Sequence, residues 1–161
     1  MRLDNFDRKI LGELQKFSKL TNVELASRVG LSPSPCLARV KELEAAGVIK
    51  EYVALLDTEK LGGAVSVFVQ VTLERQSEQA LEVFETTVSR LPEVMECYLM
   101  SGDADYLLRI VVRDTVALKD FIMDKLTRTP GVANIRSSFA LKQVKYKTSL
   151  PIPELWPSTQ K

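Results

Sequence analysis

Hydrophobic residues in the first third of the chain recur every three to four positions, which is the spacing of amphipathic helices. The pattern predicts a first helix over 3–18, a second between the caps Thr21 and Gly30, and a third between Ser32 and Gly47. The links between these helices are short, and a glycine stands where the second one ends. Three helices connected in this way predict a helix-turn-helix unit.

The residues at the helix ends support this interpretation. Asp4 is placed to cap the first helix, and Thr21 and Glu24 match a capping box at the start of the second. Pro33 occupies the first position of the third helix, where the missing N–H costs nothing. The sequence therefore predicts three helices with fixed ends.

After residue 47 the pattern changes to short alternating segments, which are typical of strands. Residues 48–56 predict a strand that serves as a wing or starts a linker, and the pair Gly62-Gly63 marks the domain boundary. Beyond it, strands are expected at 64–73, 94–100, 106–112 and 132–141, and helices at 77–91 and 114–127.

A helix-to-strand junction occurs twice in similar form, at 90–94 and at 128–132, so the order βαβ repeats. The fold class is therefore α+β: an N-terminal helix-turn-helix (winged-helix-like) domain followed by a ferredoxin-like βαββαβ domain. The expected division is a DNA-binding domain over 1–50, a strand and linker over 51–63, the ferredoxin-like domain over 64–150, and a tail over 151–161 that contains Trp156.

Composition narrows the function classes. The 161 residues are 45% hydrophobic with a net charge of +1, which is typical of a soluble globular protein. The chain has no histidine, which removes the commonest acid–base catalyst and metal ligand. No apolar run reaches the ~18 residues of a membrane helix, and no signal peptide is evident. We expect a cytoplasmic protein without metal or membrane contact that is not an enzyme, with Cys36 and Cys97 as buried reduced thiols.

The third helix carries the residues that point most directly to a function. The side chains on its outward side are short at the start of the helix and basic in the middle, which suits entry into a DNA major groove. An ordinary surface helix has similar features. Arg39 is the candidate for bidentate contact with guanine, and Lys41 for contact with phosphate. The full set of candidate DNA-binding residues is Asn22, Ser32, Ser34, Pro35, Ala38, Arg39 and Lys41.

Four segments together resemble the Lrp/AsnC (feast/famine) family of bacterial transcriptional regulators, at 22–36, 54–57, 102–108 and 130–132. The likeness is strongest to the leucine-responsive group and to regulators of branched-chain amino-acid catabolism. It implies a regulator that binds double-stranded DNA and is modulated by an amino acid such as leucine, with no other cofactor. It also implies dimers that form through the sheet and assemble into octamers. The alternative is an architectural DNA-wrapping protein that needs no effector.

The segment 102–106, with sequence Gly-Asp-Ala-Asp-Tyr, has two interpretations. Glycine and aspartate are ordinary residues of a tight hairpin. In the functional interpretation, turn amides bind the carboxylate of an amino acid, while Asp103 or Asp105 accepts from its ammonium group. The candidate effector-binding residues are Tyr98, Met100, Gly102, Asp103, Asp105 and Tyr106, together with Ile135 and Ser137, which follow from family position.

Overall fold

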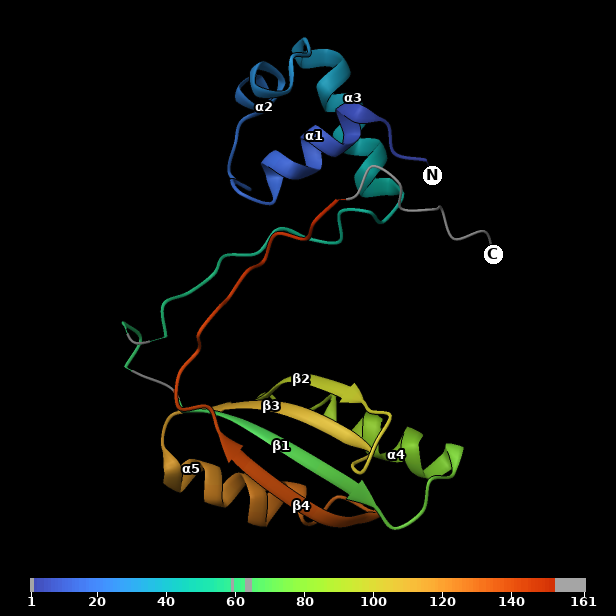
Figure 1. Cartoon of the computed structure of the whole chain (residues 1–161), viewed down its shortest axis with the longest axis vertical. Coiled ribbons are helices and arrows are strands. Elements are labelled where there is room, and N and C mark those ends of the chain that lie inside the picture. Colours follow the sequence, from blue (N-terminus) through green and yellow to red (C-terminus); the bar gives the residue numbers. More distant parts are fainter. Residues whose placement is uncertain (1, 59, 63–64, 153–161) are drawn as a thin grey trace. The chain divides into compact units, whose positions relative to one another are not determined.

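The structure is a computed structural model that describes residues 2–58, 60–62 and 65–152. Contacts divide the described chain into two compact units, one running to Leu55 and including the segment from Lys145 to Ile152, the other covering Leu56–Val144 (Figure 1). Trp156 lies outside the described residues. No helix of the described part of the chain has the length and apolar character to cross a membrane.

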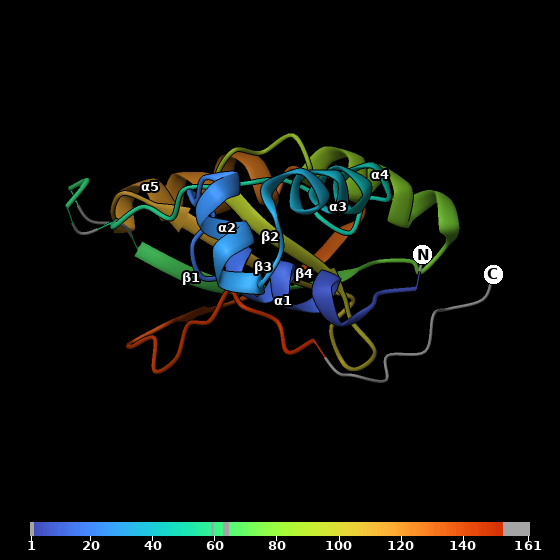
Figure 2. The same cartoon turned by 90° about the horizontal axis from the view of Figure 1, so that it is seen from above.

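Three helices form the first unit: α1 (Asn5–Leu14), α2 (Asn22–Val29) and α3 (Pro33–Ala45). Figure 2 shows them from a second direction. Their buried side chains form one core: Ile10, Leu11, Leu25, Ala26, Val29, Cys36 and Leu43. The three-helix arrangement predicted from the sequence is confirmed, although α1 is shorter than expected.

The predicted caps are also present. Asp4 and Thr21 each open a helix with a reciprocal capping box, in which the third helical residue bonds back to the cap. Gly30 closes α2 with φ of 78°, in the left-handed region that residues with a side chain rarely adopt. The link from α2 to α3 can therefore stay short.

The segment from Lys145 to Ile152 belongs with the helices of this unit. The side-chain amide of Gln15 donates to the carbonyl of Leu150 at 3.2 Å, and its oxygen accepts from the N–H of Leu150 at 2.6 Å. Ile152 is partly buried against the helical core. The end of the described chain is thus anchored on α1.

The strand expected over 48–56 is wrong. Val48 and Ile49 bend back to the carbonyl of Leu43 at the end of α3, and no described segment forms a hydrogen-bonded ladder with residues 48–56. Alternating apolar residues favour a strand only where a neighbouring strand supplies the ladder partners. In the described structure the segment is a linker without sheet pairing.

The second unit has the order βαββαβ, which confirms the ferredoxin-like prediction. Its elements are β1 (Val65–Leu73), α4 (Glu78–Val88), β2 (Val94–Leu99), β3 (Tyr106–Val112), α5 (Thr115–Asp120), η1 (Phe121–Leu126) and β4 (Val132–Phe139). The sheet order is β2-β3-β1-β4, and all neighbouring strands are antiparallel. The helix expected over 114–127 changes at Phe121 from α-helical to π-helical.

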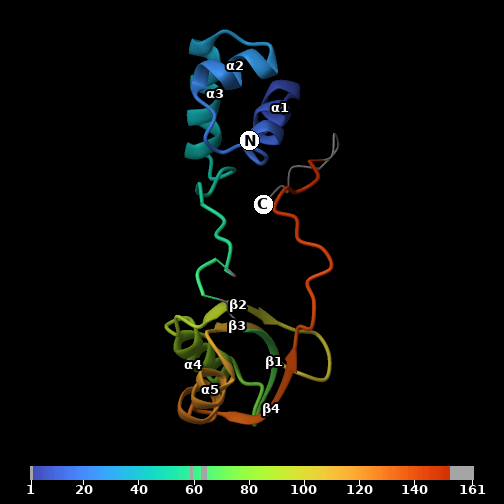
Figure 3. The ribbon, with the colours of Figure 1, turned by 90° about the vertical axis from the view of Figure 1, so that its left-hand side faces the viewer.

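One face of this sheet is covered and the other is open. Figure 3 shows α4 and α5 on the same side of the sheet. Val67, Val69 and Val71 of β1 point to that side and are fully buried. On the opposite side, Phe68 and Tyr98 have 38% and 52% of their surface exposed. This second face of the sheet is therefore uncovered by the described residues of a single chain.

Candidate DNA-binding and effector-binding sites

The outward side of α3 presents a set of exposed residues in one row along the helix. Ser34, Pro35, Ala38 and Lys41 are all exposed. Ser32 precedes the helix, and its hydroxyl makes no capping hydrogen bond. The structure therefore brings most of the candidate DNA-binding residues to one surface, as a helix that enters a groove requires.

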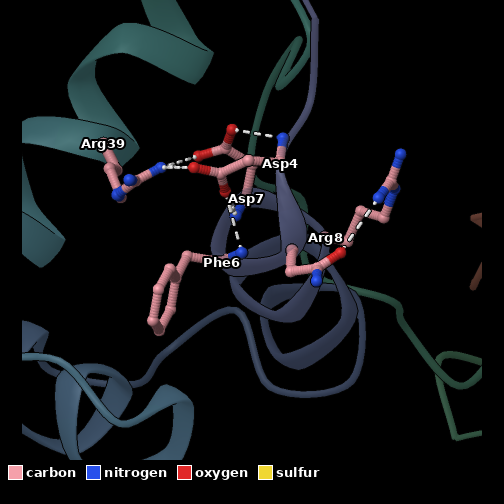
Figure 4. A network of polar contacts seen from close by, with 6 residues as sticks. Asp4, Phe6, Asp7, Arg8 and Arg39 are labelled. Atoms are coloured by element: carbon pink, nitrogen blue, oxygen red, sulfur yellow. Dashed lines mark hydrogen bonds and ion pairs between the residues drawn. The ribbon is translucent and has the colours of Figure 1, made fainter. Parts of the chain in front are cut away.

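Arg39 differs from these neighbours because its guanidinium is already engaged. One terminal nitrogen of Arg39 donates to Asp4, the N-cap of α1, and to Asp7 in its first turn, each at 2.7 Å (Figure 4). The side chain of Arg39 is 30% exposed. These contacts weigh against the interpretation of Arg39 as the residue that reads guanine.

Asn22 also makes an internal contact. Its Nδ2 donates to the carbonyl of Pro33 at 2.8 Å, which connects the start of α2 with the first turn of α3. Its Oδ1 is buried and has no partner among the described residues. Asn22 thus helps to set the turn between the two helices.

The two cysteines have different surroundings. Cys36 is fully buried in the core of the first unit, and burial raises the pKa of its thiol. Cys97 is exposed on β2, so the prediction that both thiols are buried is wrong for this residue. Burial of part of the side chain and the nearby Glu85 carboxylate raise the pKa of Cys97 to about 11. β2 is an edge strand, and alternation alone does not show which strand lies at the edge.

The hairpin between β2 and β3 borders a cavity of about 170 Å³. It is lined by Gln70, Met100, Ser101, Gly102, Asp103, Ala104 and Leu107. Asp103 is exposed, and its carboxylate has no hydrogen-bond or ion-pair partner in the part of the chain that the structure describes. The volume lies below the ~300 Å³ at which pockets for drug-sized ligands begin, which favours a small metabolite.

Gln70 and Leu107 are cavity residues that sequence reasoning missed. They stand opposite each other in the β1–β3 pair, on the open face of the sheet. Gln70 alternates with the buried Val69 and Val71, but only the pairing of β1 with β3 brings its face of the sheet next to the hairpin. Strand register therefore supplied the missing information.

Asp105 has a structural environment unlike that of Asp103. It is 6% exposed, and its carboxylate accepts from the backbone N–H of Leu73 at 2.7 Å and from the amide of Gln76 at 2.6 Å. These bonds connect the hairpin to the end of β1. The geometry thus weighs against Asp105 as the acceptor for an effector and leaves Asp103 as the available carboxylate.

Tyr106 faces away from the hairpin cavity. It is 1% exposed on the helix-covered side of the sheet, where its ring packs on Phe84 and its hydroxyl donates to Glu85 at 2.8 Å. Burial, followed by the hydrogen bond to Glu85, raises the pKa of Tyr106 well above its ordinary value. Tyr106 therefore supports the core beneath the site.

The remaining effector candidates do not line the cavity in a single chain. Tyr98 lies on the open sheet face, and its hydroxyl donates to Glu96 at 2.9 Å, which raises the pKa of Tyr98. Ile135 is partly buried against the core, and Ser137 is exposed on the edge strand β4. Three of the candidate effector-binding residues therefore line the hairpin cavity: Met100, Gly102 and Asp103.

A helix-turn-helix unit combined with a second unit that offers a small-molecule cavity defines a class of ligand-responsive DNA-binding regulators. Family models match both parts: a winged helix-turn-helix DNA-binding model over residues 3–50 and the Lrp/AsnC ligand binding domain over residues 66–150. The chain belongs to the Lrp/AsnC family of transcriptional regulators. This confirms the resemblance inferred from the sequence.

Known relatives extend along almost the whole chain. The leucine-responsive regulatory protein of Escherichia coli K12 is 46% identical over 150 residues, covering 93% of this chain and 92% of that protein. The Bkd operon transcriptional regulator of Pseudomonas aeruginosa PAO1 is 47% identical, covering 93% and 98%. These relatives are regulators, which confirms that the chain is not an enzyme.

A solved structure has the same architecture. A transcriptional regulator from Neisseria meningitidis, in complex with L-methionine, superposes with a TM-score of 0.88 at 45% identity, covering 93% of this chain and 97% of that one. An AsnC family regulator from Agrobacterium tumefaciens superposes with a TM-score of 0.87 at 44% identity, covering 92% and 97%. Both units of the chain thus have counterparts in known regulators.

Proposed function

We propose that this regulator binds double-stranded DNA through α3 and that an apolar amino acid, bound at the β2–β3 hairpin, changes its DNA binding or its assembly. The observation that carries the proposal is the hairpin cavity, where the unpartnered carboxylate of Asp103 stands beside apolar walls. The L-methionine complex of the Neisseria meningitidis relative supports an amino acid as the ligand class. Leucine and methionine are the first candidates.

The proposed DNA contacts combine two kinds of recognition. Ser34 and Ala38 are placed for base edges, whereas Lys41 contacts phosphate. Ser32 and Pro35 lie at the start of α3, where the positive end of the helix dipole favours the DNA backbone. A regulator of bacterial genes with these contacts acts in the cytoplasm.

The proposed effector contacts follow from the chemistry of an amino acid. The amides of the turn at Gly102 bind the carboxylate, and Asp103 accepts from the ammonium group. Met100 and Leu107 supply apolar surface for the side chain of the effector. This set favours an amino acid with an apolar side chain over a charged one.

The open face of the sheet is proposed as the contact between two copies of the chain. Phe68 is 38% exposed there, opposite Arg109, which forms an ion pair with Glu96 at 2.6 Å. Exposed apolar residues on one sheet face are typical of a surface that another subunit covers. Such dimers, assembled further into octamers, would repeat α3 and multiply weak DNA contacts.

A panel of all amino acids tests this function. Thermal unfolding and mass in solution are measured for the purified chain with each amino acid, and a ligand at 100-fold its Kd is expected to stabilise the protein by about 2.7 kcal/mol. We expect stabilisation by leucine, methionine or a similar amino acid. A panel in which no amino acid shifts unfolding or mass favours the effector-independent architectural role.

A further inference from the structure

A charged cluster joins the first turn of α1 to the middle of α3 (Figure 4). At the start of α1, one oxygen of the N-cap Asp4 accepts the N–H groups of Phe6 and Asp7, and one oxygen of Asp7 accepts the N–H of Asp4. The second oxygen of each carboxylate accepts from the same terminal nitrogen of Arg39. All four carboxylate oxygens of the cluster therefore have a donor.

Asp7 is the member of the cluster that is shielded from solvent. The side chain of Asp7 is 6% exposed, compared with 49% for Asp4. The guanidinium of Arg39 lies over the ring of Phe6, with Cζ 5.5 Å from the ring centroid, and the ring face attracts a cation. If Arg39 left this position, the buried carboxylate of Asp7 would lose its counter-charge, which is unfavourable.

DNA makes such a departure still less favourable. An end-on guanine contact uses both terminal nitrogens of the guanidinium, and one of them already serves both carboxylates. Moving Arg39 into a groove would also leave Asp4 and Asp7 unpaired close to DNA phosphates, which repel them. The chemistry of the cluster suits a joint between helices better than a base contact.

We propose that Asp7 and Arg39 form a clamp that orients α3 on α1 for DNA binding, with Asp7 as a positioning residue and Arg39 in contact with no base. The inference rests on the proposed DNA contact through α3. The clamp fixes the direction in which Ser34 and Lys41 are presented. Its loss weakens binding to every DNA sequence while the preferred sequence stays the same.

Two substitutions that each replace a carboxylate with a neutral amide distinguish a loss of α3 orientation from a simple change of charge near DNA. Asp7→Asn and Glu42→Gln each remove one negative charge from the first unit, and the side chain of Glu42 is exposed with no partner among the described residues. Less negative charge near DNA favours binding. Glu42→Gln is therefore expected to bind DNA as tightly as the parent or tighter, whereas Asp7→Asn is expected to bind about tenfold more weakly because a charged hydrogen bond is lost.

Arg39→Lys provides a conservative rescue. A lysine ammonium has three donors on one nitrogen, so it can serve both carboxylates as the single nitrogen of Arg39 does, although it lacks the planar guanidinium. If Arg39 acts as a clamp, Arg39→Lys binds DNA within about threefold of the affinity of the parent, and Arg39→Gln binds DNA about tenfold more weakly. The double variant Asp7→Asn/Arg39→Gln loses no more than either single variant, because both act through one contact.

The experiment uses the full-length chain and a pool of double-stranded DNA with a randomised central segment. Sequences enriched by the parent and by Arg39→Gln are compared, and the best parent sequence is titrated with every variant at several salt concentrations. Circular dichroism at the assay temperature checks that each variant is folded. We expect the same preferred sequence for both chains and an unchanged salt dependence for Arg39→Gln.

Three outcomes would overturn the clamp. They are a preference lost at one base pair with Arg39→Gln, a salt slope reduced by about one with Arg39→Gln, as for a lost phosphate contact, or Asp7→Asn binding at least as tightly as the parent. If Asp7→Asn does not fold, the base preference of Arg39→Gln still decides between the two roles. A parent chain that enriches no DNA sequence rejects the proposed function itself, and the inference with it.

Discussion

Replacing Asp105 with alanine should destabilise the second unit far more than replacing Asp103, although both residues lie in the same hairpin. Asp105 is buried and accepts two hydrogen bonds, at 2.7 Å from the N–H of Leu73 and at 2.6 Å from Gln76. Asp103 is exposed and has no partner in the described part of the chain. The same substitution thus removes a structural contact at one position and none at the other.

The size of the effect follows from these contacts. Asp105→Ala leaves the N–H of Leu73 in a buried position without an acceptor, which costs roughly 1–3 kcal/mol, and it removes the bond from Gln76 to a charged group. A total of about 3 kcal/mol lowers the midpoint of thermal unfolding by about 12–24 °C in a unit of fewer than ~100 residues. Asp103→Ala should stay within about 0.5 kcal/mol of the parent.

Calorimetry of the full-length variants, with and without the stabilising amino acid, measures the midpoint of thermal unfolding and its increase on ligand binding. Asp105→Ala is expected to lower the unfolding transition that the ligand raises in the parent. Asp103→Ala is expected to unfold like the parent without ligand and to lose the stabilisation by ligand. A similar loss of stability in both variants, or normal ligand stabilisation of Asp103→Ala, would refute this division of roles.

Two further predictions concern the first unit. Burial, together with a hydrogen bond to Glu44, raises the pKa of Tyr52 to about 12. Because this folded-state pKa lies above the unfolded value of about 10, the contribution of Tyr52 to stability is complete below about pH 10 and is lost as the pH rises towards 12. Phenolate absorbance should show a step near pH 12 that Tyr52→Phe removes, and a step near pH 10 would contradict the assignment. Gln15→Ala should release the segment around Leu150, so that trypsin cuts there faster than in the parent, and equal cleavage rates would show that the two hydrogen bonds do not hold it.

The features that the sequence predicted correctly are those fixed by neighbouring residues. Capping boxes at Asp4 and Thr21 involve residues three positions apart, and the left-handed turn at Gly30 depends on one residue. The alternation of β1 likewise reports its two faces directly. Local chemistry was sufficient for the order of the elements and therefore for the fold class.

The features that the sequence could not predict depend on contacts between distant residues. Helical periodicity places Arg39 on the outward side of α3, but it contains no information about the first turn of α1, where its partners stand. Asp103 and Asp105 are indistinguishable as turn residues until Leu73 and Gln76 are brought to the hairpin. The sequence therefore predicted the effector region, and the structure separates the buried carboxylate from the available one.

The most direct test of the account is the affinity of the full-length chain for its selected DNA, measured with and without the amino acid that stabilises it most. Asp103→Ala serves as the matched variant, because its α3 is unchanged. We predict that the amino acid shifts the DNA affinity or the assembly state on DNA of the parent, and that Asp103→Ala binds the same DNA without any shift. A parent whose DNA binding and assembly do not respond, or an Asp103→Ala variant that responds as the parent does, would contradict the account.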